Sequence, residues 1–279
     1  MQLFAPAKIN LSFKILRRRE DGFHEIDTLM APISLYDELT VEPNDPGLEF
    51  FCDEPSLPGD ESNLVVRAVR AFFAEINAEP RVRIKLRKKI PHGAGLGGGS
   101  SDAASTLMGL NALQQNRLSF DRLTSLAASL GSDVPFFLYR SAARCRGRGE
   151  IVEPRPATPQ LSLLLVKPAF GVPTAWAYQQ WRDSRAWPGI DDRPQQFGDI
   201  SFENDLERPV FQKYLFLASS KEWLRAQPEI VVALLSGSGS TIFAVLRDGA
   251  AVGTLADRAR SELDPGLWVM PSETLSRQE

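Results

Sequence analysis

Alternation of apolar and polar residues near the start of the chain predicts a β-strand. Ile9, Leu11, Phe13 and Ile15 fall on one face of an extended segment, and polar residues separate them. A period of two is typical of a strand with one buried face. An Asp-Gly pair at 21–22 then predicts a turn, and a second strand is expected just after it.

Strand-like and helical periods continue along the rest of the chain. Ser62 or Asn63 is a candidate N-cap for the first helix, and Gly131 is a candidate C-cap for the third. Strand and helix are mixed without strict β–α–β alternation, which predicts an α+β fold with helices on largely antiparallel sheets. The expected strands cover 36–42, 81–90, 161–168, 241–246 and 266–272; the expected helices cover 61–76, 100–113, 119–131, 174–181, the region 203–235 and 250–263.

A proline-rich polar stretch at 153–160 divides the chain. Such a composition indicates a linker, and a length of 279 residues allows two ordinary domains. We therefore expect one domain over residues 1–156 and a second over residues 157–279. A loop is expected over 183–199.

Composition is that of a soluble globular protein, with 43% hydrophobic and 24% charged residues. The net charge of −3 argues against nucleic acid as a partner. The sequence contains no apolar run of about 18 residues, so we expect no membrane span. Two cysteines and two histidines are too few for a disulfide framework or a zinc cluster. The start of the chain does not resemble a signal peptide, and we expect a reduced, cytoplasmic compartment.

Residues 91–105, PHGAGLGGGSSDAAS, place five glycines between a predicted strand and a predicted helix. Glycine loses more backbone freedom on folding than any other residue, so this density calls for positive φ angles or a closely approaching ligand. Free amides at the start of a helix bind anions. Ser100 and Ser101 could add hydroxyl donors or cap the helix. We interpret the stretch as a phosphate site, in preference to a turn needed only for tight packing.

Three common phosphate loops do not fit this stretch. The Walker pattern ends in Gly-Lys-Ser/Thr, which is absent. A dinucleotide site requires an acidic residue at the end of the next strand, and the candidate, Asp121, lies in a predicted helix. The protein-kinase loop is excluded because V-A-I-K, H-R-D and D-F-G do not occur.

The stretch from Pro91 to Ala104 resembles the ATP-binding motif of the GHMP kinase superfamily. APAKINLSFKI, RREDGFHEIDTLM, LGSDVPFF, GRGEIV and SGSGSTIFAV also occur in the order typical of one of its families, the 4-diphosphocytidyl-2-C-methyl-D-erythritol kinases. The glycine-rich motif alone indicates the superfamily, whereas DGFHEIDT together with GSDVPFF indicates this family. The resemblance extends from residue 5 to about residue 245.

The resemblance implies a two-domain fold, with an N-terminal ribosomal-protein-S5-like ATP-binding domain and a C-terminal ferredoxin-like domain. It implies that ATP, with Mg²⁺, phosphorylates the 2-hydroxyl of 4-diphosphocytidyl-2-C-methyl-D-erythritol in the non-mevalonate isoprenoid pathway. The acceptor is therefore a small molecule, a cytidine-diphosphate-linked polyol. The metal ligand is unknown, although Ser101 is a candidate, and we expect a monomer or a weak homodimer.

The resemblance implies that Asp133 is the catalytic base and that Lys8 assists it. A carboxylate within reach of a hydroxyl can take its proton during phosphoryl transfer, and a nearby cation holds that carboxylate ionised. The local sequence leaves two alternatives open. Asp133 could be a helix N-cap before Pro135, and Lys8 could be a solvated strand lysine.

The resemblance also implies a cytosine pocket. In it His24 would hydrogen-bond the base and two aromatic rings would stack on it. The family usually has Tyr where this chain has Phe23, so one hydroxyl is missing here. The local sequence leaves an alternative for each residue. His24 could be an ordinary histidine of the hairpin, Phe23 a core residue, and Tyr178 one aromatic residue on an amphipathic helix. The implied acceptor-binding residues are Asn10, Phe23, His24, Thr174, Tyr178, Gly237, Ser238 and Gly239.

The nucleotide site follows from the resemblance in the same way. Asn63 is equally well explained as a helix cap, and the second glycine loop, residues 236–240, as a strand-entry turn. His92 receives no role, and Arg144, Arg146 and Arg148 are weak candidates for attracting a diphosphate. The implied ATP-binding residues are Asn63, Leu64, Pro91, Gly93, Ala94, Gly95, Leu96, Gly97, Gly98, Gly99, Ser100 and Ser101.

Two other functions remain open at this point. The first is another kinase of the superfamily that acts on a small alcohol such as homoserine or mevalonate. The second is a non-catalytic nucleotide-binding module or sensor that retains the fold.

Overall fold

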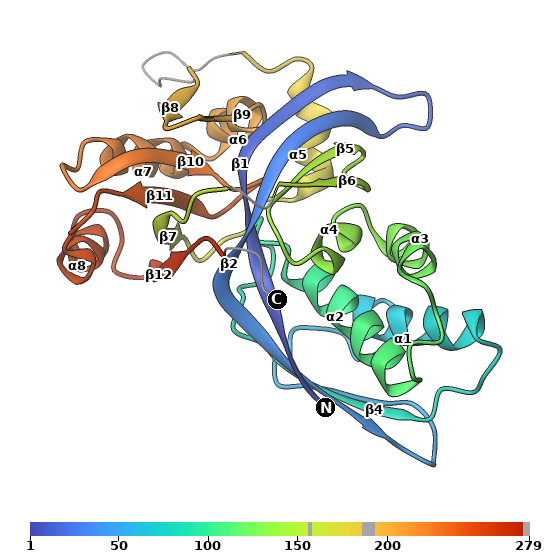
Figure 1. Ribbon diagram of the computed structural model, residues 1–279. Helices are drawn as coiled ribbons and strands as arrows, with labels where there is room; N and C mark the ends of the chain where they lie inside the picture. The colour runs from blue at the N-terminus through green and yellow to red at the C-terminus, as the bar shows by residue number, and fades with distance from the viewer. Residues whose placement is uncertain (156–157, 186–192, 276–279) are drawn as a thin grey trace.

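A computed structural model describes residues 1–155, 158–185 and 193–275. Two β-sheets and the helices packed on them make up these residues, which confirms the predicted α+β class (Figure 1). The strands are β1 (Gln2–Arg18), β2 (His24–Pro43), β3 (Glu49–Cys52), β4 (Val82–Arg87), β5 (Ala143–Gly147), β6 (Ile151–Pro154), β7 (Ser162–Lys167), β8 (Gln195–Phe197), β9 (Ile200–Asn204), β10 (Ile230–Leu235), β11 (Ile242–Leu246) and β12 (Trp268–Glu273). The helices are α1 (Leu64–Glu75), α2 (Gly98–Leu113), α3 (Phe120–Leu130), α4 (Val134–Leu138), α5 (Thr174–Trp181), α6 (Glu207–Lys213), α7 (Leu215–Arg225) and α8 (Val252–Glu262).

A long antiparallel hairpin, β1 with β2, runs through the molecule (Figure 1). Its two strands have 17 and 20 residues. The pairing register shifts at three places, between Pro6 and Ala7, Asn10 and Ser12, and Ile15 and Arg17. Such bulges bend a strand pair and increase its twist. The hairpin therefore reaches both groups of helices in Figure 1.

The first sheet has the order β3-β4-β2-β1-β9-β8, and β5 and β6 continue it beside β2. Helices α1 to α4 cover it, and their packing is built on apolar side chains. Phe72, Leu107 and Phe136 are almost completely shielded from solvent there. Burial of each such side chain contributes roughly 1.5–3 kcal/mol, so this cluster fixes the start of α2 relative to β1.

The second sheet has the order β10-β11-β7-β12. Strands β7, β10 and β11 are buried on both faces, between α6 to α8 and the β1–β2 hairpin, whereas the edge strand β12 is partly exposed. The short strands β8 and β9 follow in the sequence after α5, yet β9 pairs in parallel with β1 of the first sheet. The later part of the chain thus contributes to the sheet that carries the N-terminal strand.

Several predicted elements differ from the structure. Residues 36–42 do not form a separate strand, because they continue β2 without interruption. The prediction of helix throughout 203–235 is wrong, since β9 ends at 204 and β10 occupies 230–235. β10 is a continuous apolar run, and periodicity alone does not distinguish a buried strand from a buried helix in such a run.

The sequence analysis also failed to predict several short strands. β3, β5, β6 and β8 have three to five residues each, too few to show a clear alternation. β8 lies within the predicted loop 183–199, part of which is outside the described residues. The predicted domain boundary between residues 156 and 157 also lies outside them.

A buried ion pair supports the second sheet from its helical side. Glu207 and Lys221 are 3% and 1% exposed, and their side chains are 2.6 Å apart. The other oxygen of Glu207 accepts a hydrogen bond from the backbone N–H of Leu235, at the end of β10. Removing one member of a buried pair leaves the other charge uncompensated, which costs more than replacing both.

We predict that Lys221→Met lowers the free energy of unfolding by about 3–5 kcal/mol. The double variant Lys221→Met with Glu207→Gln should recover part of this loss, because the amide is uncharged and keeps an acceptor for Leu235 N–H. Chemical denaturation of the three proteins measures the effect. Equal stability of Lys221→Met and wild type would contradict a structural role for the pair.

Candidate active site

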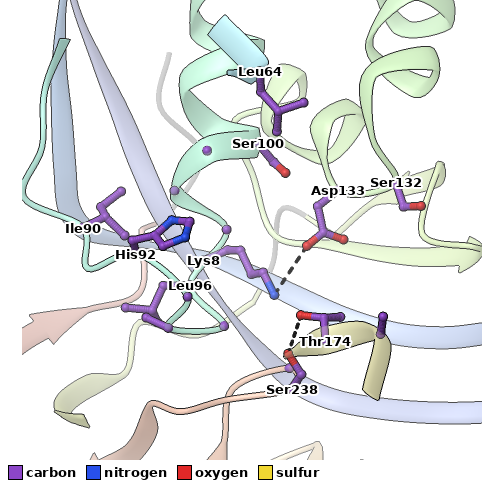
Figure 2. A pocket seen from close by; sticks show the side chains of 18 of the residues that line it. Lys8, Leu64, Ile90, His92, Leu96, Ser100, Ser132, Asp133, Thr174 and Ser238 are labelled. Carbon is purple, nitrogen blue, oxygen red and sulfur yellow. Dashed lines mark hydrogen bonds and ion pairs between the residues drawn. The ribbon is translucent and has the colours of Figure 1, made fainter. Parts of the chain in front are cut away.

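A cavity of about 850 Å³ lies where the β1–β2 hairpin, the glycine turn before α2, α4, α5 and the loop after β10 meet. Figure 2 shows side chains from these elements directed into one space. Almost all residues singled out from the sequence line it. These are Lys8, Asn10, Phe23, His24, Asn63, Leu64, Pro91, Gly93, Ala94, Gly95, Leu96, Gly97, Gly98, Gly99, Ser100, Asp133, Thr174, Tyr178, Gly237 and Ser238.

Two residues of the predicted set do not line this cavity. Ser101 is completely buried, and its hydroxyl has no hydrogen-bond partner in the described part of the chain. Gly239 packs against the Leu235 side chain. A Cβ added at Gly239 would lie 2.8 Å from it.

The glycine turn leads directly into helix α2. Gly97 is the N-cap with φ +71°, and the helix begins at Gly98. Gly93 and Gly95 also have positive φ, a region that favours glycine. The predicted capping role of Ser100 or Ser101 is therefore wrong, since both lie within the first helical turn. That turn leaves backbone N–H groups at a helix start beside the cavity, an arrangement that suits an anion.

The glycine turn packs against the second glycine loop, backbone to backbone. A Cβ on Gly95 would lie 2.1 Å from the carbonyl oxygen of Ser236. Thr241 N–H donates to the Ala94 carbonyl over 3.1 Å, and the Ser236 hydroxyl donates to the Gly95 carbonyl over 3.0 Å. Tight packing thus requires glycine at position 95. At Gly99 the nearest atom to an added Cβ is 3.7 Å away, on Leu64, so packing does not require glycine there.

Lys8 and Asp133 face one another across the cavity (Figure 2). Lys8 Nζ is 3.6 Å from Asp133 Oδ2, and the side chains are 5% and 35% exposed. Lys8 Nζ also donates to Asn10 Oδ1 over 2.6 Å, and Asn10 in turn donates to the Thr28 hydroxyl over 2.8 Å. The backbone N–H of Lys8 donates to the Leu96 carbonyl, which fixes the strand beside the glycine turn.

The two local alternatives for this pair have different outcomes. Asp133 occupies the N-cap position of α4, as one alternative proposed, but its side chain makes no capping hydrogen bond in the described structure. Lys8 is not a solvated strand lysine, because its side chain is buried. The pair thus places a buried ammonium beside a partly exposed carboxylate at the wall of the cavity.

Aromatic side chains form the opposite end of the cavity. The His24 ring stacks on the Tyr178 ring with centroids 5.2 Å apart, and the edge of Trp181 is close by. Phe23 is 51% exposed, so it is not a core residue, and the Arg148 guanidinium lies 4.9 Å from its ring centre. This end of the cavity presents flat apolar faces and polar edges, which suits a planar base.

Burial sets the protonation of both rings. Burial, with a smaller contribution from Arg18, lowers the pKa of His24. His24 is therefore neutral at pH 7 and offers one donor and one acceptor. Burial, and secondarily the charge of Asp133, raises the pKa of the Tyr178 hydroxyl, which stays protonated.

The second glycine loop reaches the same space. Ser238 and Thr174 share a hydrogen bond of 2.8 Å between their hydroxyls (Figure 2). A Cβ on Gly237 would lie 3.2 Å from Asn10 Oδ1 and 3.4 Å from Lys8 Nζ. The loop therefore does more than start β11, because it also closes one side of the cavity around the Lys8 ammonium.

Asn63 caps helix α1, as the local alternative proposed. Its Oδ1 accepts from Val65 N–H over 2.9 Å, and its Nδ2 donates to the Pro58 carbonyl over 2.9 Å. Asn63 and Leu64 nevertheless line the cavity, and Leu64 lies beside Gly99 of the glycine turn. The cap thus fixes these residues in the cavity wall beside the glycine turn.

A charged cluster in this cavity escaped the sequence analysis. Lys88 is bonded to Asp37 and lies 2.7 Å from Asp102, and Lys88 and Asp102 line the cavity. Asp37 also accepts from the N–H groups of Lys89 and Ile90. The signal available in the sequence was an aspartate inside the apolar first turns of a predicted helix, where a charge needs a partner.

The pKa values of Asp102 and Lys88 are both raised in this cluster. Burial, the largest effect, raises the pKa of Asp102 to about 8, because desolvation and Asp37 outweigh the opposing effect of Lys88. Burial acts to lower the pKa of Lys88, but the two carboxylates together raise it. The cluster thus keeps its ammonium and carries a proton on Asp102 near neutral pH.

The side-chain oxygen atoms near the glycine turn fit a magnesium ion that is bound mainly by the phosphates of a ligand. Mg²⁺ usually takes only one or two protein oxygens and keeps several waters and phosphate oxygens. The Ser101 hydroxyl is unpartnered and the Asp133 carboxylate faces the cavity. Within the described residues, no group of three or more His, Cys, Asp and Glu is arranged to hold a metal.

The described helices include none with the length and apolarity needed to cross a bilayer.

The three arginines that precede β6 lie in different environments. Arg144 is bonded to Asp27 and Arg146 lies near Glu153, whereas Arg148 lines the cavity.

Comparison with known proteins assigns both halves of the chain to one superfamily. Residues 63–141 match the GHMP kinases N terminal domain, and residues 191–264 match the GHMP kinases C terminal family. The chain is 43% identical over 278 residues to the 4-diphosphocytidyl-2-C-methyl-D-erythritol kinase of Methylacidiphilum infernorum, covering 98% of this chain and 96% of that protein. It is 40% identical to the kinase of the same name from Geobacter metallireducens, covering 87% and 88%.

Solved structures give the same result at the level of the fold. A crystal structure of 4-(cytidine 5'-diphospho)-2C-methyl-D-erythritol kinase is 36% identical, with a TM-score of 0.79, and covers 99% of this chain and 100% of that one. Homoserine kinase from Cytophaga hutchinsonii has a TM-score of 0.72 at 18% identity, covering 100% and 95%, which shows a shared fold alone.

We predict that Asp102 makes the stability of the protein depend on pH near neutrality. Its folded-state pKa of about 8 lies above the ordinary value of 3.8, so the folded state holds a proton that the unfolded chain releases. Stability from this group is complete below pH 3.8 and is lost as the pH rises to about 8. Denaturation between pH 6 and 9 should show wild type losing stability relative to Asp102→Asn up to about pH 8.

Asp121→Asn is the control for this measurement, because Asp121 is an exposed carboxylate on α3. Parallel stability curves for wild type and Asp102→Asn would show that Asp102 is ionised throughout and would contradict the assignment.

Proposed function

The chain belongs to the 4-diphosphocytidyl-2-C-methyl-D-erythritol kinase family of the GHMP kinases, and we propose that it phosphorylates the 2-hydroxyl of that cytidylated polyol in the non-mevalonate isoprenoid pathway. It is a kinase, and ATP use follows from the family. The observation that carries the proposal is the Lys8–Asp133 pair, which lies in one cavity between the glycine turn and the His24–Tyr178 stack.

ATP lies along the glycine turn in this proposal. The N–H groups at the start of α2 bind its phosphates, and the helix dipole adds to their attraction for negative charge. The adenine lies toward Asn63 and Leu64. When bound with ATP, Mg²⁺ would supply positive charge that offsets the charge on the transferred phosphoryl group. Asp133, whose carboxylate faces the cavity, and Ser101, whose unpartnered hydroxyl lies in the first turn of α2, would be the protein groups that hold that ion.

The cytidine end of the acceptor lies at the aromatic end of the cavity. Neutral His24 hydrogen-bonds the edge of the base, and Phe23 and Tyr178 provide stacking faces worth about 1–3 kcal/mol per base. His24 and Tyr178 are already stacked on each other, so the base packs against this pair and not between its members. Phe23 retains the stacking face although it lacks the hydroxyl of a tyrosine.

The chemical step transfers one proton and one phosphoryl group. The acceptor oxygen forms a bond to the γ-phosphorus, the bond from that phosphorus to the β–γ bridging oxygen breaks, and ADP leaves. Asp133 takes the hydroxyl proton as this occurs. Lys8 assists as a positive charge 3.6 Å from Asp133 and stabilises negative charge on the acceptor oxygen. Holding the two substrates in line can supply up to roughly 7–11 kcal/mol of the barrier.

The two alternatives from the sequence are less well supported. A kinase of a small alcohol has no use for the aromatic end of the cavity, which Phe23, His24 and Tyr178 line. A sensor without catalysis has no use for a buried lysine directed at a carboxylate. The family assignment favours the cytidylated acceptor over both.

We predict that purified protein with ATP and Mg²⁺ releases ADP with 4-diphosphocytidyl-2-C-methyl-D-erythritol and not with mevalonate or homoserine. The His24→Ala variant should lose affinity for the acceptor and keep the KM for ATP, because His24 lies away from the glycine turn. A coupled ADP-release assay measures both. Turnover with a small alcohol would refute the cytosine pocket. An absence of ADP release with all three acceptors would favour the non-catalytic sensor.

We predict that Asp133→Asn lowers kcat by about 10²–10⁴-fold, the usual contribution of a general base. The amide is nearly the same size but does not accept the hydroxyl proton. ATP affinity, followed by calorimetric titration, should change little. Asp121→Asn, a carboxylate on the surface of α3, provides the control. Wild-type kcat in the Asp133→Asn protein would exclude Asp133 as the base.

A further inference from the structure

Asn204 ends strand β9, and every hydrogen-bonding atom of its side chain is occupied. Its Nδ2 donates to the carbonyls of Leu235 and Gly237, both over 2.7 Å. Its Oδ1 accepts from the N–H of Leu206 over 2.9 Å. The residue is only 7% exposed. This set of partners leaves the carboxamide a single orientation, with its two N–H bonds directed at the start of the second glycine loop.

The backbone around Asn204 is held to the strand that carries Lys8. Phe13 of β1 pairs with Asn204 in the parallel register. The next residue strengthens this attachment from both sides. Asp205 N–H donates to the Phe13 carbonyl over 2.9 Å, and the Asp205 carboxylate accepts from Ile15 N–H over 2.8 Å. Asn204 is therefore fixed with respect to β1 before its side chain reaches the loop.

The loop end of these contacts lies beside the Lys8 ammonium. Gly237 approaches Lys8 Nζ and Asn10 Oδ1 so closely that an added Cβ would lie 3.4 Å and 3.2 Å from them. The following residue, Ser238, is bonded to Thr174. Leu235 is held from the opposite side, because its N–H donates to Glu207. A shift of the loop would therefore change the surroundings of Lys8 directly.

We propose that Asn204 is a positioning residue for phosphoryl transfer. Its two N–H groups hold the Gly237–Ser238 segment against Lys8 and Asn10, and so fix the wall of the cavity on the Lys8 side. The effect on turnover rests on the proposed function, whereas the effect on the loop does not. Loss of positioning should reduce kcat, since a misplacement of about 1 Å can cost about 10²-fold in rate.

The test is Asn204→Asp, which keeps the shape of the side chain but removes both N–H donors. Asn111→Asp is the matched control. Asn111 is equally buried, at 6% exposure, and it too donates to a carbonyl and accepts from an N–H, both of Leu118. It lies at the far end of α2 from the cavity. Asn204→Ala is a second variant that adds no charge if the aspartate prevents folding.

We predict that the Asn204 variants have a kcat about 10- to 100-fold lower than that of wild type, with a KM for ATP within about twofold of the wild-type value. The control Asn111→Asp should keep the wild-type kcat at a comparable loss of thermal stability. Hydrogen exchange should be faster at residues 235–241 in the Asn204 variants and unchanged there in the control. In Asn204→Asp, a further Ser238→Ala change should cost less kcat than it costs alone, because the loop is already displaced.

Equal kcat in Asn204→Asp, Asn204→Ala and wild type would overturn the proposal, and so would exchange at 235–241 that does not change. Fully additive effects of Asn204→Asp and Ser238→Ala would likewise reduce Asn204 to a structural residue. If wild type turned over none of the offered alcohols, the proposed function would fail, while the exchange measurement would still decide whether Asn204 holds the loop.

Discussion

The contact between two glycine loops is the constraint on which the cavity depends. Gly95 and Ser236 meet backbone to backbone, at a distance that excludes any side chain on residue 95. Hydrogen bonds to Ala94 and Gly95 from Thr241 and Ser236 join the same two segments. Because one loop begins α2 and the other joins β10 to β11, this contact sets the start of α2 and the Lys8 side of the cavity relative to each other.

Lys8 lies where the other supports of the site converge. The β1–β2 hairpin carries it, the Leu96 carbonyl holds its backbone, and Asn10 holds its ammonium. Its charge faces Asp133 at the start of α4, a helix fixed by apolar packing against α2. The geometry of the Lys8–Asp133 pair therefore depends on burial in the helical layer as much as on the pair itself. A buried ammonium with two fixed oxygens nearby needs no reorganisation when charge develops on an acceptor oxygen.

Local signals in the sequence predicted the parts of the site that short segments determine. The glycine stretch between a strand and a helix predicted the start of α2, and alternation along residues 7–16 placed Lys8 and Asn10 on one face. Contacts between distant segments were not predictable in this way. Lys88 meets Asp37 across 51 positions of sequence, and nothing local to either residue indicates the other. The apolar run of β10 was mistaken for helix because its burial on both faces removes the periodicity that distinguishes the two.

The parallel pairing of β9 with β1 has a consequence for synthesis of the chain on the ribosome. Ile15 and its partner Asp205 are 190 positions apart. At about 5–20 residues per second, this edge of β1 waits roughly ten to forty seconds for its partner to be made. Unpaired strand edges attract other chains during such intervals. The nascent N-terminal part of the chain therefore exposes this unpaired strand edge until residue 205 has been made.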